Sequence, residues 1–165
     1  MNKKYRRLVA VRNEISLTDP TLSLDILDSC GDPDTPCLHL ILPTAVECYF
    51  VWGNQWLVKN LLHPNESSAE IGVHKRTNPK LVALSVIAES VMHELEASTR
   101  PAGAMGHTEP DAAALNVVTA RFEILERFAE TQQLSDPETQ AHAQKLVVHV
   151  GPFVEALLQS VSTNH

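Results

Sequence analysis

The stretch from Asn78 to Arg100 constrains the fold most, because it has both the start and the apolar pattern of a long helix. Asn78 can accept a hydrogen bond from an early backbone N–H, and Pro79 fits the first turn of a helix. Apolar residues then recur at spacings of three and four, which lines one helix face. They are Leu81, Leu84, Ala88, Val91 and Leu95. A helix with such a stripe needs a surface to pack against.

Two later segments repeat this pattern. The first stripe comprises Leu115, Val118, Phe122, Leu125 and Ala129, and the second comprises Leu146, Val150, Val154, Leu157 and Val161. Because an isolated helix is marginal in water, we expect the three stripes to pack against one another. The sequence therefore predicts a mostly α fold with an antiparallel helical bundle over residues 78–161.

Local signals divide the predicted bundle into its helices. Residues 100–107 contain one proline and two glycines, which is typical of a linker. Thr108 and Ser135 each precede an acidic residue by three positions, a spacing typical of a capping box. Gly151-Pro152 should kink or break the last helix near Val148, because proline cannot donate to the carbonyl four residues back.

The N-terminal half gives weaker signals. Residues 3–17 fit neither the helical nor the strand period cleanly, and we favour a helix. Asp19 before a proline can start a helix, and Gly31 in a left-handed backbone conformation can end it. These residues predict a second helix over residues 19–31. Residues 71–74 read as a short edge strand.

Residues 37–63 leave two alternatives open. Thr44 and Glu47 form a possible capping box, which favours a helix. Aromatic and β-branched residues, with Gly53-Asn54 as a two-residue turn, favour a β-meander instead. Its strands would span residues 37–42, 47–52 and 55–61. With the meander the fold is α+β, and in either case we expect a single domain.

That domain comprises a basic arm, an N-terminal half and the bundle, over residues 1–12, 13–77 and 78–161. The arm contains Lys3, Lys4, Arg6, Arg7 and Arg12, whereas the rest of the chain has eight basic and twenty acidic residues. Affinity for nucleic acid comes from cations that neutralise phosphates. The acidic body therefore disfavours a broad nucleic-acid surface, and the arm is the one candidate for such binding.

Composition favours a cytoplasmic protein. The apolar run from Leu8 to Val11 is too short for a signal peptide, and no segment has the roughly 20 apolar residues needed to span a bilayer. Three cysteines, Cys30, Cys37 and Cys48, are too few for a disulfide scaffold. We therefore expect no membrane partner and a reducing compartment.

Aromatic residues concentrate in one place. Tyr49, Trp52 and Trp56 include both tryptophans of a chain that is 5% aromatic. Such residues bury a large area for few rotatable bonds and keep a polar group, so a cluster of them suits a partner-binding surface. The alternative is core packing.

Histidines and acids suggest a metal site as a further alternative. Glu89 and His93 would share one face of the first bundle helix, and His142 and His149 lie two turns apart on the last. If those helices faced each other, the four side chains could hold zinc or iron. The alternative is that they are surface histidines paired with acids.

No common catalytic signature is present: the chain lacks Gly-x-Ser-x-Gly, P-loop, Gly-x-Gly-x-x-Gly and His-Glu-x-x-His patterns. The first hypothesis is therefore a non-enzymatic regulatory protein without a cofactor, which binds another protein or itself as a homodimer. The alternatives are a nucleic-acid-associated regulator that uses the basic arm, and a metal-binding helical-bundle enzyme.

Overall fold

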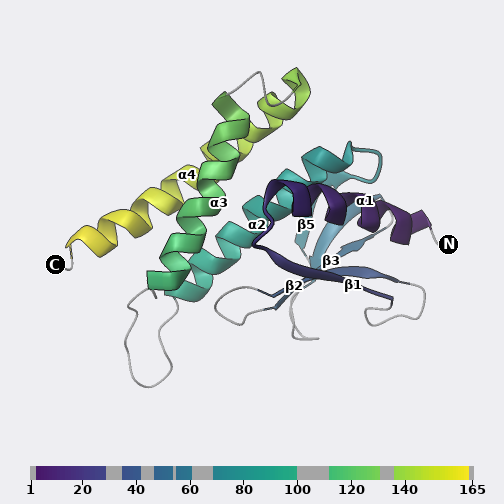
Figure 1. Ribbon diagram of the computed structural model, residues 1–165, viewed down its shortest axis with the longest axis horizontal. Helices are drawn as coiled ribbons and strands as arrows, with labels where there is room; N and C mark the ends of the chain where they lie inside the picture. Colours follow the sequence, from purple (N-terminus) through teal and green to yellow (C-terminus); the bar gives the residue numbers. More distant parts are fainter. Residues whose placement is uncertain are drawn as a thin grey trace. The chain divides into compact units, whose positions relative to one another are not determined.

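The computed structural model describes residues 3–28, 35–41, 47–53, 55–60, 69–99, 112–130 and 136–163 (Figure 1). Its helices are α1 (Lys3–Thr18), α2 (Pro79–Thr99), α3 (Ala112–Glu130) and α4 (Pro137–Thr163). Its strands are β1 (Ser23–Leu27), β2 (Cys37–Ile41), β3 (Glu47–Trp52), β4 (Trp56–Asn60) and β5 (Ala69–His74). The chain divides into two compact units, Met1–Ser85 and Val86–His165, with the boundary inside α2.

The fold is α+β, and the meander alternative for residues 37–61 is confirmed. The five strands form one antiparallel sheet in the order β1-β2-β3-β4-β5. Each strand pairs with the next along the chain, with Cys37 opposite Val51 and Trp52 opposite Leu57. The predicted short strand over residues 71–74 is β5, and it lies at an edge of the sheet.

The predicted helix over residues 19–31 is wrong, because β1 occupies this segment. Asp19 closes the turn after α1 rather than starting a new helix: its backbone N–H donates to the carbonyl of Ile15 at 2.7 Å. Its carboxylate accepts from the backbone N–H and hydroxyl of Thr21, at 3.2 and 2.6 Å. An Asx-type turn uses the same residues as a helix cap, so the local signal was ambiguous. Pairing with β2 decides for the strand.

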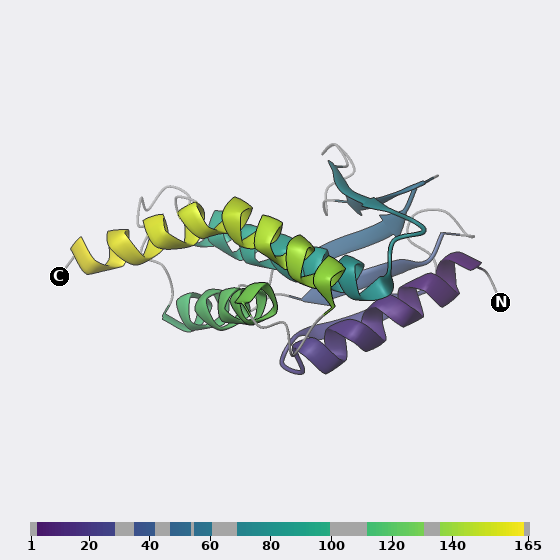
Figure 2. The same ribbon diagram turned by 90° about the horizontal axis from the view of Figure 1, so that it is seen from above.

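One face of the sheet is covered by α1, which confirms the helix favoured for residues 3–17. Leu8, Val11 and Ile15 are buried on α1, and the helix contacts β1 and β2 (Figures 1 and 2). Side chains alternate between the faces of a strand. Phe50 is buried on one face of the sheet. The other buried residues on the same face are Ile26, Leu38, Leu40, Cys48, Trp52 and Leu57.

A bulge shapes the β4–β5 pair. Val58 pairs with Glu70 and Trp56 pairs with His74, so three residues of β5 lie opposite Leu57 alone. Gly72 lies among these three and has φ +72°. Extra residues in one strand strengthen its local twist, and a positive φ favours glycine. The bulge therefore directs the end of β5 into the turn that precedes α2.

The start of α2 is confirmed. Asn78 accepts a hydrogen bond from the backbone N–H of Lys80 at 3.0 Å through its side chain, and Pro79 is the first helical residue. The predicted stripe is buried, but so is every residue from Leu81 to Ala88. A helix that is apolar on all sides is an internal helix rather than an amphipathic surface helix. The apolar stripe predicted from the sequence therefore covers only part of the surface that α2 buries.

In the second unit, the carboxyl-terminal part of α2 with α3 and α4 forms the predicted bundle, and α3 packs along α4 (Figures 1 and 2). The predicted stripes of α3 and α4 are buried or half-buried, apart from Val161, whose side chain lies outside the described residues. The cap of α4 is Asp136, which accepts from the backbone N–H of Thr139 at 2.7 Å. Asp136 takes the capping position that we predicted for Ser135. Ser135, Thr108 and the linker over residues 100–107 lie outside the described residues.

The predicted break near Val148 is wrong, because α4 continues to Thr163 with Pro152 inside it. Pro152 is exposed, so the carbonyl that it leaves without a donor can meet water. Buried side chains on the opposite face, Val150, Val154 and Leu157, hold the helix by packing. A Cβ at Gly151 would lie 3.6 Å from the ring of Phe122, which shows how closely α3 approaches α4 here. Packing therefore outweighs the lost hydrogen bond.

In the part of the chain that the structure describes, every helix is either too short or too polar to cross a lipid bilayer.

Candidate functional site

The first unit contains a cavity of about 550 Å³ at the amino-terminal end of α1. Three segments far apart in the sequence line it: the start of α1, the end of β3 and the turn between β5 and α2. The lining residues are Lys3, Lys4, Arg7, Trp52, Gly53, Lys75 and Arg76. We call this cavity the basic pocket. Its size is in the range of small-molecule sites.

The sheet brings these segments together. Trp52 is the last residue of β3 and shares the face of Phe50, which is the face that α1 covers. The backbone N–H of Gly53 donates to the carbonyl of Trp56 at 2.9 Å, which closes the hairpin. The backbone N–H of Lys75 donates to the carbonyl of Gln55 at 2.7 Å, which fixes the following turn to that hairpin. The wall made by β3 and this turn is therefore held by backbone hydrogen bonds.

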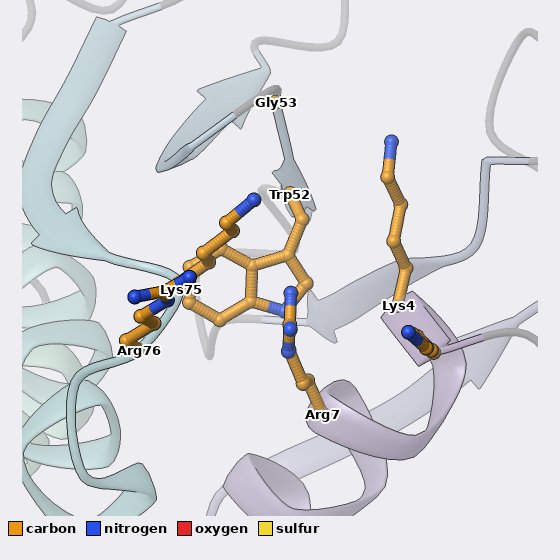
Figure 3. A pocket seen from close by; sticks show the side chains of 7 residues that line it. Lys4, Arg7, Trp52, Gly53, Lys75 and Arg76 are labelled. Atoms are coloured by element: carbon orange, nitrogen blue, oxygen red, sulfur yellow. The ribbon is translucent and has the colours of Figure 1, made fainter.

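An indole lies at the centre of the basic pocket. Trp52 is only 3% exposed, and its Nε1–H has no hydrogen-bond acceptor among the described residues. Figure 3 shows its ring between Arg7, which rises from α1, and the side chains of Lys75 and Arg76. A buried donor without an acceptor is costly, and most such groups in folded proteins have a partner. The indole N–H is therefore a donor whose acceptor lies outside the described residues.

Positive charge dominates the lining. Residues 1–85 contain nine Lys and Arg residues and nine Asp and Glu residues, yet five of the cations and none of the acids line the basic pocket. Among the described residues, the side chains of Lys3, Arg7 and Lys75 have no carboxylate within ion-pair distance. Like charges held close together repel one another. An anion in the basic pocket would relieve this repulsion.

The helix itself adds to the positive potential. The first turn of α1 contains no acidic residue and begins with Lys3 and Lys4. A helix N-terminus carries a partial positive charge and is stabilised by acidic, not basic, side chains. These lysines are therefore unfavourable for α1 and favourable for a bound anion, as expected where function rather than stability selects the residues.

The basic arm predicted from the sequence is divided by the helix. Lys3, Lys4 and Arg7 line the basic pocket, whereas Arg6 and Arg12 do not. Arg6 is exposed and Arg12 is half-buried. The predicted arm is therefore the first part of an ordered helix, and only one side of it contributes to the site.

The predicted aromatic cluster is divided as well. Tyr49 pairs with His39 and stacks on its ring at 4.7 Å, on the sheet face opposite Trp52. Trp56, which is 39% exposed, makes an edge-on contact with His74 at 5.1 Å. Because side chains alternate along β3, Tyr49 and Trp52 cannot share one surface.

The four predicted metal ligands do not gather into a site. Among the described residues, no group of three or more His, Cys, Asp or Glu side chains could hold a metal ion. His93 is buried, with Nδ1 3.8 Å from Oε2 of Glu96, and Glu89 is half-buried. His142 is half-buried, and the exposed His149 lies edge-on to a neighbouring aromatic ring. This arrangement gives the metal-binding hypothesis no support.

Comparison with protein-family models, with curated proteins and with solved structures finds no match to this chain. The site therefore has to be interpreted from its own geometry. Sequence reasoning missed Lys75 and Arg76, which lie between the predicted edge strand and the helix that begins at Asn78. Their signal was a Lys-Arg pair one residue before the cap of α2, and only the sheet brings it beside the other cations.

Proposed function

We propose that this protein is a non-enzymatic binding protein whose first unit recognises an anionic ligand in the basic pocket. The observation that carries this proposal is the buried indole N–H of Trp52, which has no acceptor among the described residues and lies among five cationic side chains. Hydrogen bonds to charged groups are about twice as strong as neutral ones. An anion would satisfy the indole and neutralise the lysines and arginines at once.

This proposal gives a specific form to the first hypothesis from the sequence, a regulatory protein that acts by binding. The alternative of a nucleic-acid-associated regulator that uses the basic arm stays a prediction, and Lys3, Lys4 and Arg7 of that arm line the basic pocket. Binding through Tyr49 and Trp56 and the formation of a homodimer stay predictions, as does the metal-binding enzyme.

A thermal-shift experiment at low ionic strength tests the proposal. The probes are sulfate, tripolyphosphate, a single-stranded oligonucleotide and poly-glutamate, each added to the full chain. A ligand that binds only the folded state raises the melting temperature, because it stabilises that state. The gain in stability is about 2.7 kcal/mol at a ligand concentration one hundred times the dissociation constant. We expect at least one probe to raise the melting temperature.

Variants decide whether the effect comes from the basic pocket. Arg7→Gln removes a lining cation and should weaken binding by about 1.5–3 kcal/mol, the contribution of a hydrogen bond to a charged group. Arg6→Gln is the matched control, because it removes the same charge from the adjacent exposed position. The proposal is wrong if no probe raises the melting temperature, or if both variants lose the shift equally.

A further inference from the structure

Resting on the proposed function, we propose that the ligand is a short polyphosphate, a chain of two or three phosphoryl groups as in pyrophosphate, triphosphate or a nucleoside polyphosphate. The basic pocket would recognise the phosphate chain and not an attached base. The charge, shape and chemistry of the lining support this class of ligand over other anions.

The number of cations points to more than one phosphoryl group. A single phosphate carries about 1.5 to 2 negative charges at neutral pH, whereas five cations line the basic pocket. A chain of two or three phosphoryl groups brings correspondingly more charge and more oxygen acceptors. Arg7 and Arg76 can each donate two parallel hydrogen bonds, and the lysines act as point charges at the remaining oxygens.

Burial of the indole argues against recognition of a nucleobase. A base stacks on an exposed aromatic face, but Trp52 is only 3% exposed and presents no such face. The described lining residues include no carboxylate and no side-chain amide. Such groups are the partners of cytosine and adenine edges, and the arginines and lysines that read guanine elsewhere are engaged here by the phosphate chain. Binding should therefore depend little on which base, if any, is attached.

The distribution of charge argues against a nucleic-acid strand. Proteins that bind strands carry cations along a stripe or groove. Here more than half of the Lys and Arg residues of the first unit converge on one cavity, and the other four are outnumbered by its nine acids. A compact polyanion fits this distribution, because its charge is concentrated over the same short distance.

The lining also predicts competition with Mg²⁺. This ion prefers carboxylate oxygens as its protein ligands, and none of the seven lining residues provides one. A magnesium ion on the phosphate chain would remove negative charge without gaining a contact to the protein. Binding should therefore be stronger without Mg²⁺.

Isothermal titration of the full chain tests the proposal with orthophosphate, pyrophosphate, tripolyphosphate, ATP and GTP in magnesium-free buffer. We expect tripolyphosphate to bind at least about tenfold more tightly than orthophosphate, since each additional charged hydrogen bond contributes a factor of this size. ATP and GTP should bind within about threefold of each other, because the base makes no specific contact. Excess Mg²⁺ should weaken every polyphosphate.

Two variants assign the binding to the basic pocket. Trp52→Phe removes the indole N–H and should weaken tripolyphosphate binding about tenfold. Trp56→Phe is its matched control, because it changes the other tryptophan, on the opposite face of the sheet, and should leave the affinity unchanged. Lys75→Gln, in a surface turn, serves as the second lining variant if Trp52→Phe does not fold.

The outcomes separate this inference from the function on which it rests. Equal binding of orthophosphate and tripolyphosphate, a tenfold preference for one base, or tighter binding with Mg²⁺ would overturn the polyphosphate proposal. If the oligonucleotide or poly-glutamate binds through Arg7 while no polyphosphate does, the anion-binding function stands and the ligand class is wrong. If no anion binds, both are wrong.

Discussion

Gly72 has a backbone conformation that residues with a Cβ rarely adopt, and it lies in the strand that leads to the basic pocket. It has φ +72° within the bulge of β5, two residues before His74 and three before Lys75. Apart from its two chain neighbours, no heavy atom of the described residues lies within 4 Å of the position that its Cβ would occupy. A substitution here therefore tests backbone conformation without a steric contribution.

We expect Gly72→Ala to destabilise the protein by about 1–2 kcal/mol, the cost of a left-handed backbone for a residue with a Cβ. Gly72→Asn should cost less, because asparagine tolerates this region better. Gly151→Ala is the control: it lies in a helix, where alanine is favoured by up to about 1 kcal/mol, but Pro152 restricts a preceding residue with a Cβ, so the two terms offset and the net effect should be smaller. Urea denaturation measures all three. Equal effects of the two alanine substitutions would contradict the role of the positive φ.

Glu126 on α3 is a second residue with a testable role. Burial, and then the charges of Glu130 and Glu123, raise the pKa of its carboxyl group above the ordinary value. The folded state thus favours the protonated form. This contribution to stability is fully present below the unfolded pKa and is lost as the pH rises through the raised folded pKa.

Replacing this carboxylate should therefore help at neutral pH and not in acid. We expect Glu126→Gln to stabilise the protein by about 0.2–0.5 kcal/mol near pH 7, the size of a like-charge helix pair. The gain should vanish near about pH 4, where the wild-type carboxyl is also protonated. Melting temperatures across this range measure the effect. Glu138→Gln is the control and should destabilise the protein at neutral pH, because Glu138 lies in the first turn of α4, where a negative charge interacts favourably with the helix dipole. If the stabilisation by Glu126→Gln persisted in acid, the raised pKa of Glu126 would not be its cause.

At the scale of elements, segments with a long repeated pattern were predictable and a short segment was not. The capped start at Asn78 and the three apolar stripes each identify a helix correctly, since many residues contribute to one pattern. The segment after Asp19 is short, and its cap signal also fits a turn. Likewise Pro152 predicted a break that packing of the opposite face prevents. Local chemistry is reliable where no tertiary contact competes with it.

The element α1 allows a prediction that separates stability from binding. Lys3→Glu replaces an unfavourable charge in its first turn with a favourable one, so we expect a gain of about 0.3–1 kcal/mol in stability. The same change should weaken tripolyphosphate binding, because Lys3 lines the basic pocket. Arg6→Glu is the control and should change affinity much less. Thermal melts and titration calorimetry together test this; a stabilised Lys3→Glu protein with unchanged affinity would exclude Lys3 from the site.

At the scale of the whole molecule, charge is distributed unequally between the two units. Residues 1–85 are balanced, and residues 86–165 carry four Lys and Arg against eleven Asp and Glu, so the net charge of −7 belongs to the second unit. A protein that is acidic overall can still bind an anion where cations converge, because mobile ions screen distant charges over about 8–10 Å. Net charge from composition was therefore a poor guide to this site.

The sequence alone determined the helices with repeated apolar stripes and the start of α2. Each depends on residues that are neighbours in the chain, so their chemistry decides the local structure. Only the tertiary structure decided that residues 37–60 pair as strands, which puts Tyr49 and Trp52 on opposite faces, and that Lys75 joins Lys3 and Arg7 around the indole. Those relations depend on strand register and on a helix packed across the sheet, and residues about seventy positions apart cannot signal them by any local pattern.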